Sequence, residues 1–145
     1  HDVVESIEED LSENFKKHND KFVNGIPSNH IIQGNYSLIY SIFRNLVDNA
    51  IAYAGDNVTI SVNSEKRGNE IKVTFSDNGK GVREEHLPYI FERFYRVDKG
   101  RSRSMGGTGL GLAIVKHAVG LHGGYIEATQ TKGGGLTFVF TLRVS

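Results

Sequence analysis

Apolar residues recur at steps of three and four in two stretches of the chain, which is the spacing of an amphipathic helix. These stretches cover residues 2–18 and about 36–54. Their apolar stripes are Val4, Ile7, Leu11 and Phe15 in the first, and Ile39, Ile42, Phe43, Leu46 and Ala50 in the second. A third helix is predicted from the apolar run that ends near Leu121, where Gly123 and Gly124 would stop it.

Apolar and polar residues alternate in four other stretches, which is the period of a strand with one wet face. Residues 58–62 and 71–75 flank "KRGN", and residues 125–130 and 136–144 flank "TKGGG", so each pair predicts a hairpin. Shorter extended segments are expected at 21–26 and 30–33, a loop at 77–88 and a short helix at "PYIFERFY", residues 88–95. Helices and largely antiparallel strands together predict two packed layers without an internal repeat.

The composition is that of one ordinary domain. Its 145 residues are 38% hydrophobic, and 17 basic side chains balance 17 acidic ones, so the bulk charge does not attract nucleic acid or anionic lipid. No apolar run approaches the roughly 20 residues that span a bilayer. The absence of cysteine excludes disulfides and thiol chemistry. We therefore expect a soluble, cytoplasmic chain that meets any polyanion locally and binds no nucleic acid.

The run "GGTGLGLAIVK", residues 106–116, places four glycines in six residues ahead of an apolar helix. It matches neither the Walker pattern nor the dinucleotide fingerprint, and it follows a polar tract rather than a buried strand. Glycine permits close approach of the backbone, and the amides at a helix N-terminus carry partial positive charge, so residues 107–111 could cradle an anion. A flexible turn before a helix is the plainer interpretation of such a cluster taken alone.

Two carboxamides and one carboxylate add candidate chemistry. Asn45 and Asn49 in "RNLVDNA" stand four residues apart on one face of the second helix, where their oxygens could ligate Mg²⁺. Asp77 in "FSDNGKG" ends an alternating strand just before Gly79 and Gly81. A carboxylate at the floor of a pocket accepts a hydrogen bond from the amine of adenine and repels the carbonyl of guanine. Taken singly, the asparagines are also typical of exposed positions, and "DNG" of a turn.

Four stretches, taken in order, resemble the ATP-binding domain of sensor histidine kinases, in the wider family that includes DNA gyrase and the large heat-shock chaperones. They are "NLVDNA" as the N box, "DNGKGV" as the first glycine box, "FERFYRV" as the F box and "GGTGLGL" as the second glycine box. The resemblance implies an α/β (α+β) two-layer sandwich of Bergerat type, with a mixed, largely antiparallel sheet covered on one face by helices. It also implies a connecting helix at residues 1–20 and an ATP-binding catalytic domain at 21–145.

The resemblance implies a role for each matching position. Asn45 and Asn49 would meet Mg²⁺ and the phosphates of ATP, and Asp77 would bind the adenine amine. The remaining nucleotide contacts would be Tyr53, Gly79 and Gly81 at the base, and Gly107, Thr108, Gly109, Leu110 and Gly111 at the phosphates. Phe91 and Phe94 would anchor an ATP lid at residues 98–105, and Arg96 or Arg103 would reach the γ-phosphate. A core role for the phenylalanines and a solvated basic loop for the arginines are the alternatives.

Two positions in the N-box helix bear on the reaction. Ala52 stands where many family members carry lysine, and we hypothesise that Arg96 or Arg103 supplies the missing phosphate contact. The gyrase and chaperone branches carry a glutamate where this chain has Asn45, and an amide is no useful proton acceptor near neutral pH. Asp48, the nearest carboxylate, lies about 100° round the helix from Asn49. We therefore expect slow hydrolysis and favour transfer of the γ-phosphoryl group to a histidine.

The acceptor histidine is expected elsewhere, because no histidine of this chain has the sequence context of the family's acceptor. The histidines considered are His1, His18, His30, His86, His117 and His122. The implied partners are the dimerisation and histidine phosphotransfer domain of a parent kinase, which an inner membrane could anchor, and indirectly a response regulator. We expect this fragment itself to be monomeric. The alternatives are an anti-sigma type serine kinase, against which Asn45 argues, a slow ATPase, and a nucleotide-binding module without catalysis.

Overall fold

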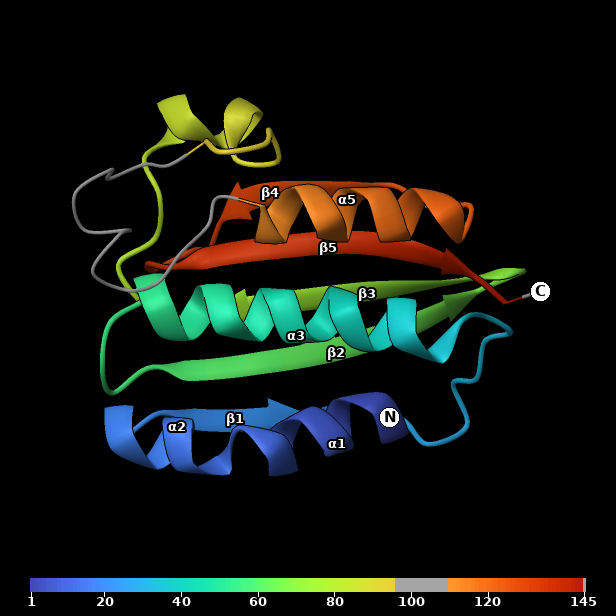
Figure 1. Ribbon diagram of the computed structural model, residues 1–145, viewed down its shortest axis with the longest axis horizontal. Helices are drawn as coiled ribbons and strands as arrows, with labels where there is room; N and C mark the ends of the chain where they lie inside the picture. Colours follow the sequence, from blue (N-terminus) through green and yellow to red (C-terminus); the bar gives the residue numbers. More distant parts are fainter. Residues whose placement is uncertain (96–109, 145) are drawn as a thin grey trace.

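The fold is an open sheet with helices on one side, as the computed structural model of residues 1–95 and 110–144 describes it (Figure 1). Its elements in chain order are α1 (Asp2–Asp10), α2 (Ser12–His18), β1 (Lys21–Asn24), α3 (Tyr36–Tyr53), β2 (Thr59–Arg67), β3 (Glu70–Asp77), the 3₁₀ helix η1 (Glu84–Tyr89), α5 (Gly111–Leu121), β4 (Ile126–Gln130) and β5 (Leu136–Arg143). None of the helices in the described residues is long and apolar enough to cross a membrane.

Within the described residues, the sheet has five strands in the order β1-β2-β3-β5-β4. β1 runs parallel to β2, and every other neighbouring pair is antiparallel, so the expected mixed, largely antiparallel sheet is confirmed. Both predicted hairpins are present, as β2–β3 and β4–β5. The extended segment expected at 30–33 is wrong as a strand. A turn closed by the His30 N–H on the Pro27 carbonyl (3.1 Å) precedes this segment, whose Gln33 N–H donates to the carbonyl of Val144 just after β5 (2.9 Å).

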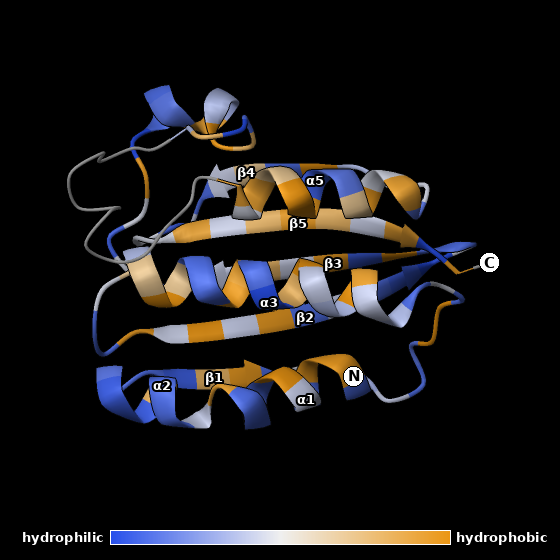
Figure 2. Cartoon of the chain, viewed as in Figure 1, coloured by the Kyte–Doolittle hydropathy of each residue, from blue (hydrophilic) through white to orange (hydrophobic). Residues whose placement is uncertain are grey.

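The core lies between the sheet and the helices. Every residue of the predicted stripe on α3 is buried, and so are the alternate residues Ile71, Val73 and Phe75 on β3. The ring of Phe43 on α3 packs 5.7 Å from that of Phe140 on β5, centroid to centroid. Figure 2 shows β5 coloured mainly as hydrophobic along its length. Burial of this shared apolar surface is what holds α3 and the sheet together.

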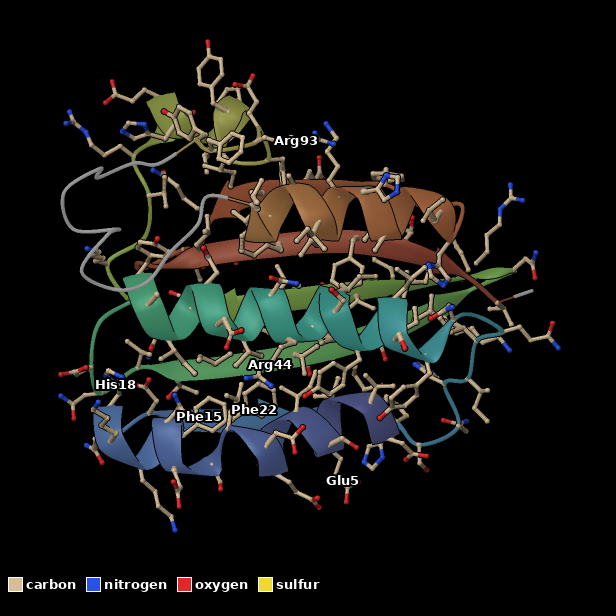
Figure 3. The ribbon with its side chains drawn as sticks, viewed as in Figure 1. Glu5, Phe15, His18, Phe22, Arg44 and Arg93 are labelled. Atoms are coloured by element: carbon tan, nitrogen blue, oxygen red, sulfur yellow. The ribbon has the colours of Figure 1, made fainter. Side chains whose placement is uncertain are left out.

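The predicted helix at residues 2–18 is in fact two helices, α1 and α2, whose apolar residues belong to the core. Leu11 interrupts the helix with φ −106° and ψ 10°, yet all four residues of the predicted stripe are buried. Phe15 of α2 stacks on Phe22 of β1, with ring centroids 5.4 Å apart (Figure 3). Tyr40 of α3 donates its hydroxyl hydrogen to Asp10 of α1 (2.6 Å). That residues 1–20 also connect to a further domain stays a prediction.

The short helix expected at residues 88–95 is wrong in its place. A 3₁₀ helix covers Glu84–Tyr89 instead, so it begins within the segment expected to be loop and ends at the second residue of the predicted helix, and turns follow it. Phe94 adopts φ +64°, the left-handed region, which an α-helix cannot include. By contrast, α5 ends as expected, because Gly123 takes φ +72° and the Gly124 N–H donates to the Val119 carbonyl (3.1 Å).

Candidate functional site

Asp77 stands at the end of the buried row of β3. Side chains on a strand alternate between faces, so Asp77 shares the helix-covered face with Ile71, Val73 and Phe75 and is 7% exposed. Its Oδ1 accepts hydrogen bonds from the N–H groups of Gly79 (2.9 Å) and Leu136 (3.4 Å). Burial raises the pKa of the Asp77 carboxyl, although these two hydrogen bonds act to lower it. Among the described residues, both of these N–H groups donate to the same oxygen of the carboxylate, Oδ1.

The turn after Asp77 lies against the end of α3 and the β4–β5 turn. A Cβ on Gly79 would stand 2.3 Å from the carbonyl oxygen of Ala54, so no larger residue fits without movement of backbone. Gly81 takes φ +72°, and a Cβ there would stand 2.8 Å from the carbonyl oxygen of Gly135. Ala54 directly follows the half-buried Tyr53. The structure thus brings Asp77, Gly79 and Gly81 together with the end of α3, one residue after Tyr53.

Asn45 lies at the N-terminus of α5. A Cβ on Gly111 would stand 3.1 Å from its Oδ1. The Nδ2 of Asn45 donates to the carbonyl oxygen (2.7 Å) and the hydroxyl (3.1 Å) of Ser41, so its oxygen is the atom directed toward α5. Asn49 follows one turn later on the same face of α3 and is half-buried. The Asn45 oxygen therefore lies at the start of α5, and a helix N-terminus favours negative charge.

The carboxylate nearest to these asparagines faces elsewhere. Asp48 is exposed and pairs with Arg44 across one turn of α3, with Nε 3.3 Å from the carboxylate. Arg44 also donates from a terminal guanidinium nitrogen to the Tyr40 hydroxyl (3.1 Å), and in Figure 3 it lies on the side of α3 next to α1 and α2. The prediction that Asp48 points away from the asparagines is confirmed.

The residues predicted to anchor the lid and to contact the phosphates are only partly described by the structure. Phe91 packs edge-on against Phe138 of the core, with ring centroids 6.0 Å apart, so the core role is confirmed for it. Phe94 is 67% exposed, so a core role for it is wrong. Arg96, Arg103, Gly107, Thr108 and Gly109, with the lid at 98–105, lie outside the described residues, and their expected roles stay predictions. Leu110 and Gly111 are described, at the start of α5.

Sequence reasoning missed several groups that hold Asp77 in place. The Leu136 N–H reaches Asp77 because β5 pairs beside β3, and the Thr131 hydroxyl donates to the Asp77 carbonyl (3.2 Å). On the other side, Asn78 accepts from the Thr59 N–H (2.7 Å). The glycine-rich turn at 133–135 was the one local signal, since a Cβ on Gly135 would stand 2.0 Å from the Asp77 carbonyl oxygen.

Comparisons with known proteins show the family of this chain. The family model described as "Histidine kinase-, DNA gyrase B-, and HSP90-like ATPase" matches residues 34–145. The sensor-like histidine kinase SenX3 of Mycolicibacterium smegmatis is 42% identical over 116 residues, which are 80% of this chain and 30% of SenX3. The phosphate regulon sensor protein PhoR of Haemophilus influenzae is 42% identical over 132 residues, 90% of this chain and 31% of PhoR. The chain thus spans about a third of the length of these curated relatives.

Solved structures show the same architecture. The nucleotide-free catalytic domain of the histidine kinase ThkA superposes with a TM-score of 0.84 at 26% identity, covering 99% of this chain and 91% of that one. ThkA in complex with the response regulator protein TrrA gives a TM-score of 0.80 at 23% identity, covering 99% of this chain and 40% of that one. The expected two-layer fold of histidine kinase catalytic domains is therefore confirmed.

Proposed function

We propose that this chain binds Mg-ATP and donates the γ-phosphoryl group to a histidine on a separate domain. The starting point is its family, because the chain belongs to the histidine kinase-, DNA gyrase B- and HSP90-like ATPases. Membership of an ATPase family implies the ATP binding itself. The observation that supports the rest is the combination of a buried carboxylate at a glycine turn with Asn45 at the N-terminus of α5.

Adenine recognition is assigned to Asp77. Its Oδ1 is engaged by two backbone N–H groups, so its Oδ2 accepts the hydrogen bond from the exocyclic amine. Gly79 and Gly81 let the base edge approach main chain, and Tyr53 lies against the base. Guanine presents a carbonyl oxygen at the position of the amine, which the carboxylate repels. The site therefore selects ATP over GTP.

The phosphates and Mg²⁺ are assigned to α3 and α5. Mg²⁺ takes oxygen ligands and keeps substrate phosphates and water as the others, which fits two neutral amide oxygens better than a full protein cage. The Oδ1 of Asn45 meets this requirement, because the Nδ2 of the same side chain donates to Ser41. The backbone amides at Leu110 and Gly111, with Gly107, Thr108 and Gly109 before them, contact the phosphates. Arg96 or Arg103 reaches the γ-phosphate.

The reaction is transfer rather than hydrolysis, because neither Asn45 nor Asp48, the candidates in the described part of the N-box helix, is suited to activating water. Asn45 cannot accept a proton usefully near neutral pH, and Asp48 is engaged with Arg44 on another side of the helix. This domain contributes positioning of the γ-phosphate and neutralisation of its charge. The nucleophile is a histidine on the dimerisation hairpin of a parent sensor kinase in the cytoplasm, from which a response regulator takes the phosphoryl group.

Calorimetric titration with Mg-ATP tests this proposal. We expect saturable binding heat that returns to a flat baseline, because bound ATP waits for its histidine, and much weaker heat with Mg-GTP. Sustained heat flow after each injection would show continuing hydrolysis and replace the kinase proposal with an ATPase. Absence of any binding heat would contradict the nucleotide site itself.

A further inference from the structure

His122, just after α5, connects the end of that helix to the start of α3. Its Nδ1 donates to the carbonyl oxygen of Ala118 (2.8 Å), and its Nε2 accepts from the backbone N–H of Asn35 (3.3 Å). One ring nitrogen donates and the other accepts, so the two bonds together specify the neutral ring with its proton on Nδ1. Asn35 is the N-cap of α3, where its own side chain accepts from the Leu38 N–H (3.1 Å).

The chain makes room for this ring. A Cβ on Gly34 would stand 2.7 Å from the Nε2 of His122 and 2.8 Å from its Cδ2, so even alanine at this position would displace the imidazole. The backbone of His122 is fixed as well, since its carbonyl oxygen accepts from the Arg143 N–H at the end of β5 (3.1 Å). The ring therefore occupies one defined position between α3, α5 and the sheet.

α5 packs along α3, and the contact at His122 marks one end of this packing. The helices run side by side in opposite directions (Figure 1), and the second contact is that of Asn45 with Gly111. Asn35 and Asn45 are ten positions apart along α3 and its N-cap, which is about 15 Å at the rise of an α-helix. Gly111 and His122 are eleven positions apart along α5 and its C-cap, which is about 16.5 Å. These lengths match, so a shift of α5 at His122 moves Gly111 along α3 by a similar distance.

We propose that His122 is a positioning residue for the phosphates of the bound nucleotide. By holding the end of α5 on the N-cap of α3, it sets where the amides at Leu110 and Gly111 stand relative to Asn45. His122 itself lies about 16 Å along the helix from that end and touches no nucleotide. Asp77 is carried by β3, so binding of the adenine base does not depend on this contact. The inference rests on the proposed function, because it concerns the same site.

Two substitutions separate the two hydrogen bonds of His122. In His122→Asn the amide can still donate to Ala118, as Nδ1 does, but it is too short to accept from Asn35. In His122→Gln the longer side chain can accept from Asn35, as Nε2 does. The dissociation constants of Mg-ATP and of AMP are measured by calorimetry for both variants and the unaltered chain, with thermal unfolding as the check on folding.

We expect His122→Asn to weaken Mg-ATP by about threefold to tenfold, the effect of one hydrogen bond, and to leave AMP unchanged. His122→Gln should recover most of the ATP affinity. An unchanged ratio of ATP to AMP affinity in His122→Asn, or equal losses in Asn and Gln variants, would overturn the inference. Failure of the unaltered chain to bind ATP would instead contradict the proposed function.

Gly34→Ala supplies an independent variant in case His122→Asn does not fold. It leaves the histidine in the sequence but introduces the Cβ that displaces the ring from Asn35. We expect the same selective loss of ATP over AMP. If Gly34→Ala changed the ATP affinity and the AMP affinity by the same factor, a positioning role for the ring would be contradicted.

Discussion

Replacement of Asp77 by asparagine tests the adenine site at a single atom. In the native site Oδ1 accepts two backbone N–H bonds, so in Asp77→Asn the amide oxygen keeps that place and the NH₂ group takes the position of Oδ2. A donor then faces the donor amine of adenine. Loss of a hydrogen bond to a buried charged group amounts to about 1–3 kcal/mol, or roughly a 5- to 150-fold weaker affinity for ATP and ADP.

The same substitution has an opposite effect on the stability of the nucleotide-free chain. Burial raises the pKa of Asp77 above its ordinary value of 3.8, so the folded state holds this proton more tightly than the unfolded state. The stabilisation that the protonated Asp77 carboxyl gives to the folded state is complete below pH 3.8, and it is lost as the pH rises through the raised pKa. At neutral pH the ionised carboxylate therefore lowers stability, and Asp77→Asn should unfold at no lower temperature than the unaltered chain.

Calorimetry with Mg-ATP and ADP and thermal unfolding at pH 7 measure both effects. Asp48→Asn is the matched control, because it makes the same chemical change at an exposed residue paired with Arg44. That variant should keep its affinity and show no change in turnover. Native ADP affinity in Asp77→Asn would refute the assignment of the base to Asp77, and a large fall in its unfolding temperature would refute the argument from burial.

Three further variants test other parts of the account. Substituting both Arg96 and Arg103 by alanine should weaken ATP more than ADP in calorimetry, and an unchanged ATP affinity would show that neither replaces the missing lysine. Gly79→Ala, whose Cβ would meet the Ala54 carbonyl at 2.3 Å, should lower both adenosine affinity and unfolding temperature. Phe15→Ala should cost about 3–5 kcal/mol in urea unfolding, because α2 belongs to the core; no change would mean that residues 1–20 only connect.

Local patterns predicted much of the fold because they report burial directly. The three- and four-residue spacing of α3 and the alternation along β3 both correspond to side chains that the structure buries. The same alternation places Asp77 after Phe75 on the buried face, so the sequence already contained the reason for its raised pKa. Spacing likewise put Asn45 and Asn49 on one face of a helix.

Contacts between distant segments were beyond these patterns. The pairing of β3 with β5 brings the Leu136 N–H to Asp77 across 59 positions, and no local signal encodes that partner. His122 likewise contacts Asn35 across 87 positions, and no local signal encodes that contact. The interruption at Leu11 and the exposure of Phe94 also depend on tertiary surroundings rather than on periodicity.

The most direct test of the central claim is a transfer assay with γ-labelled ATP, Mg²⁺, this chain and the separately prepared histidine hairpin of its parent kinase. The account predicts label on the hairpin that is labile in acid and stable in alkali, as expected for phosphohistidine, and little free phosphate when the hairpin is omitted. Release of labelled phosphate at the same rate with and without the hairpin, and no label on the hairpin, would contradict it.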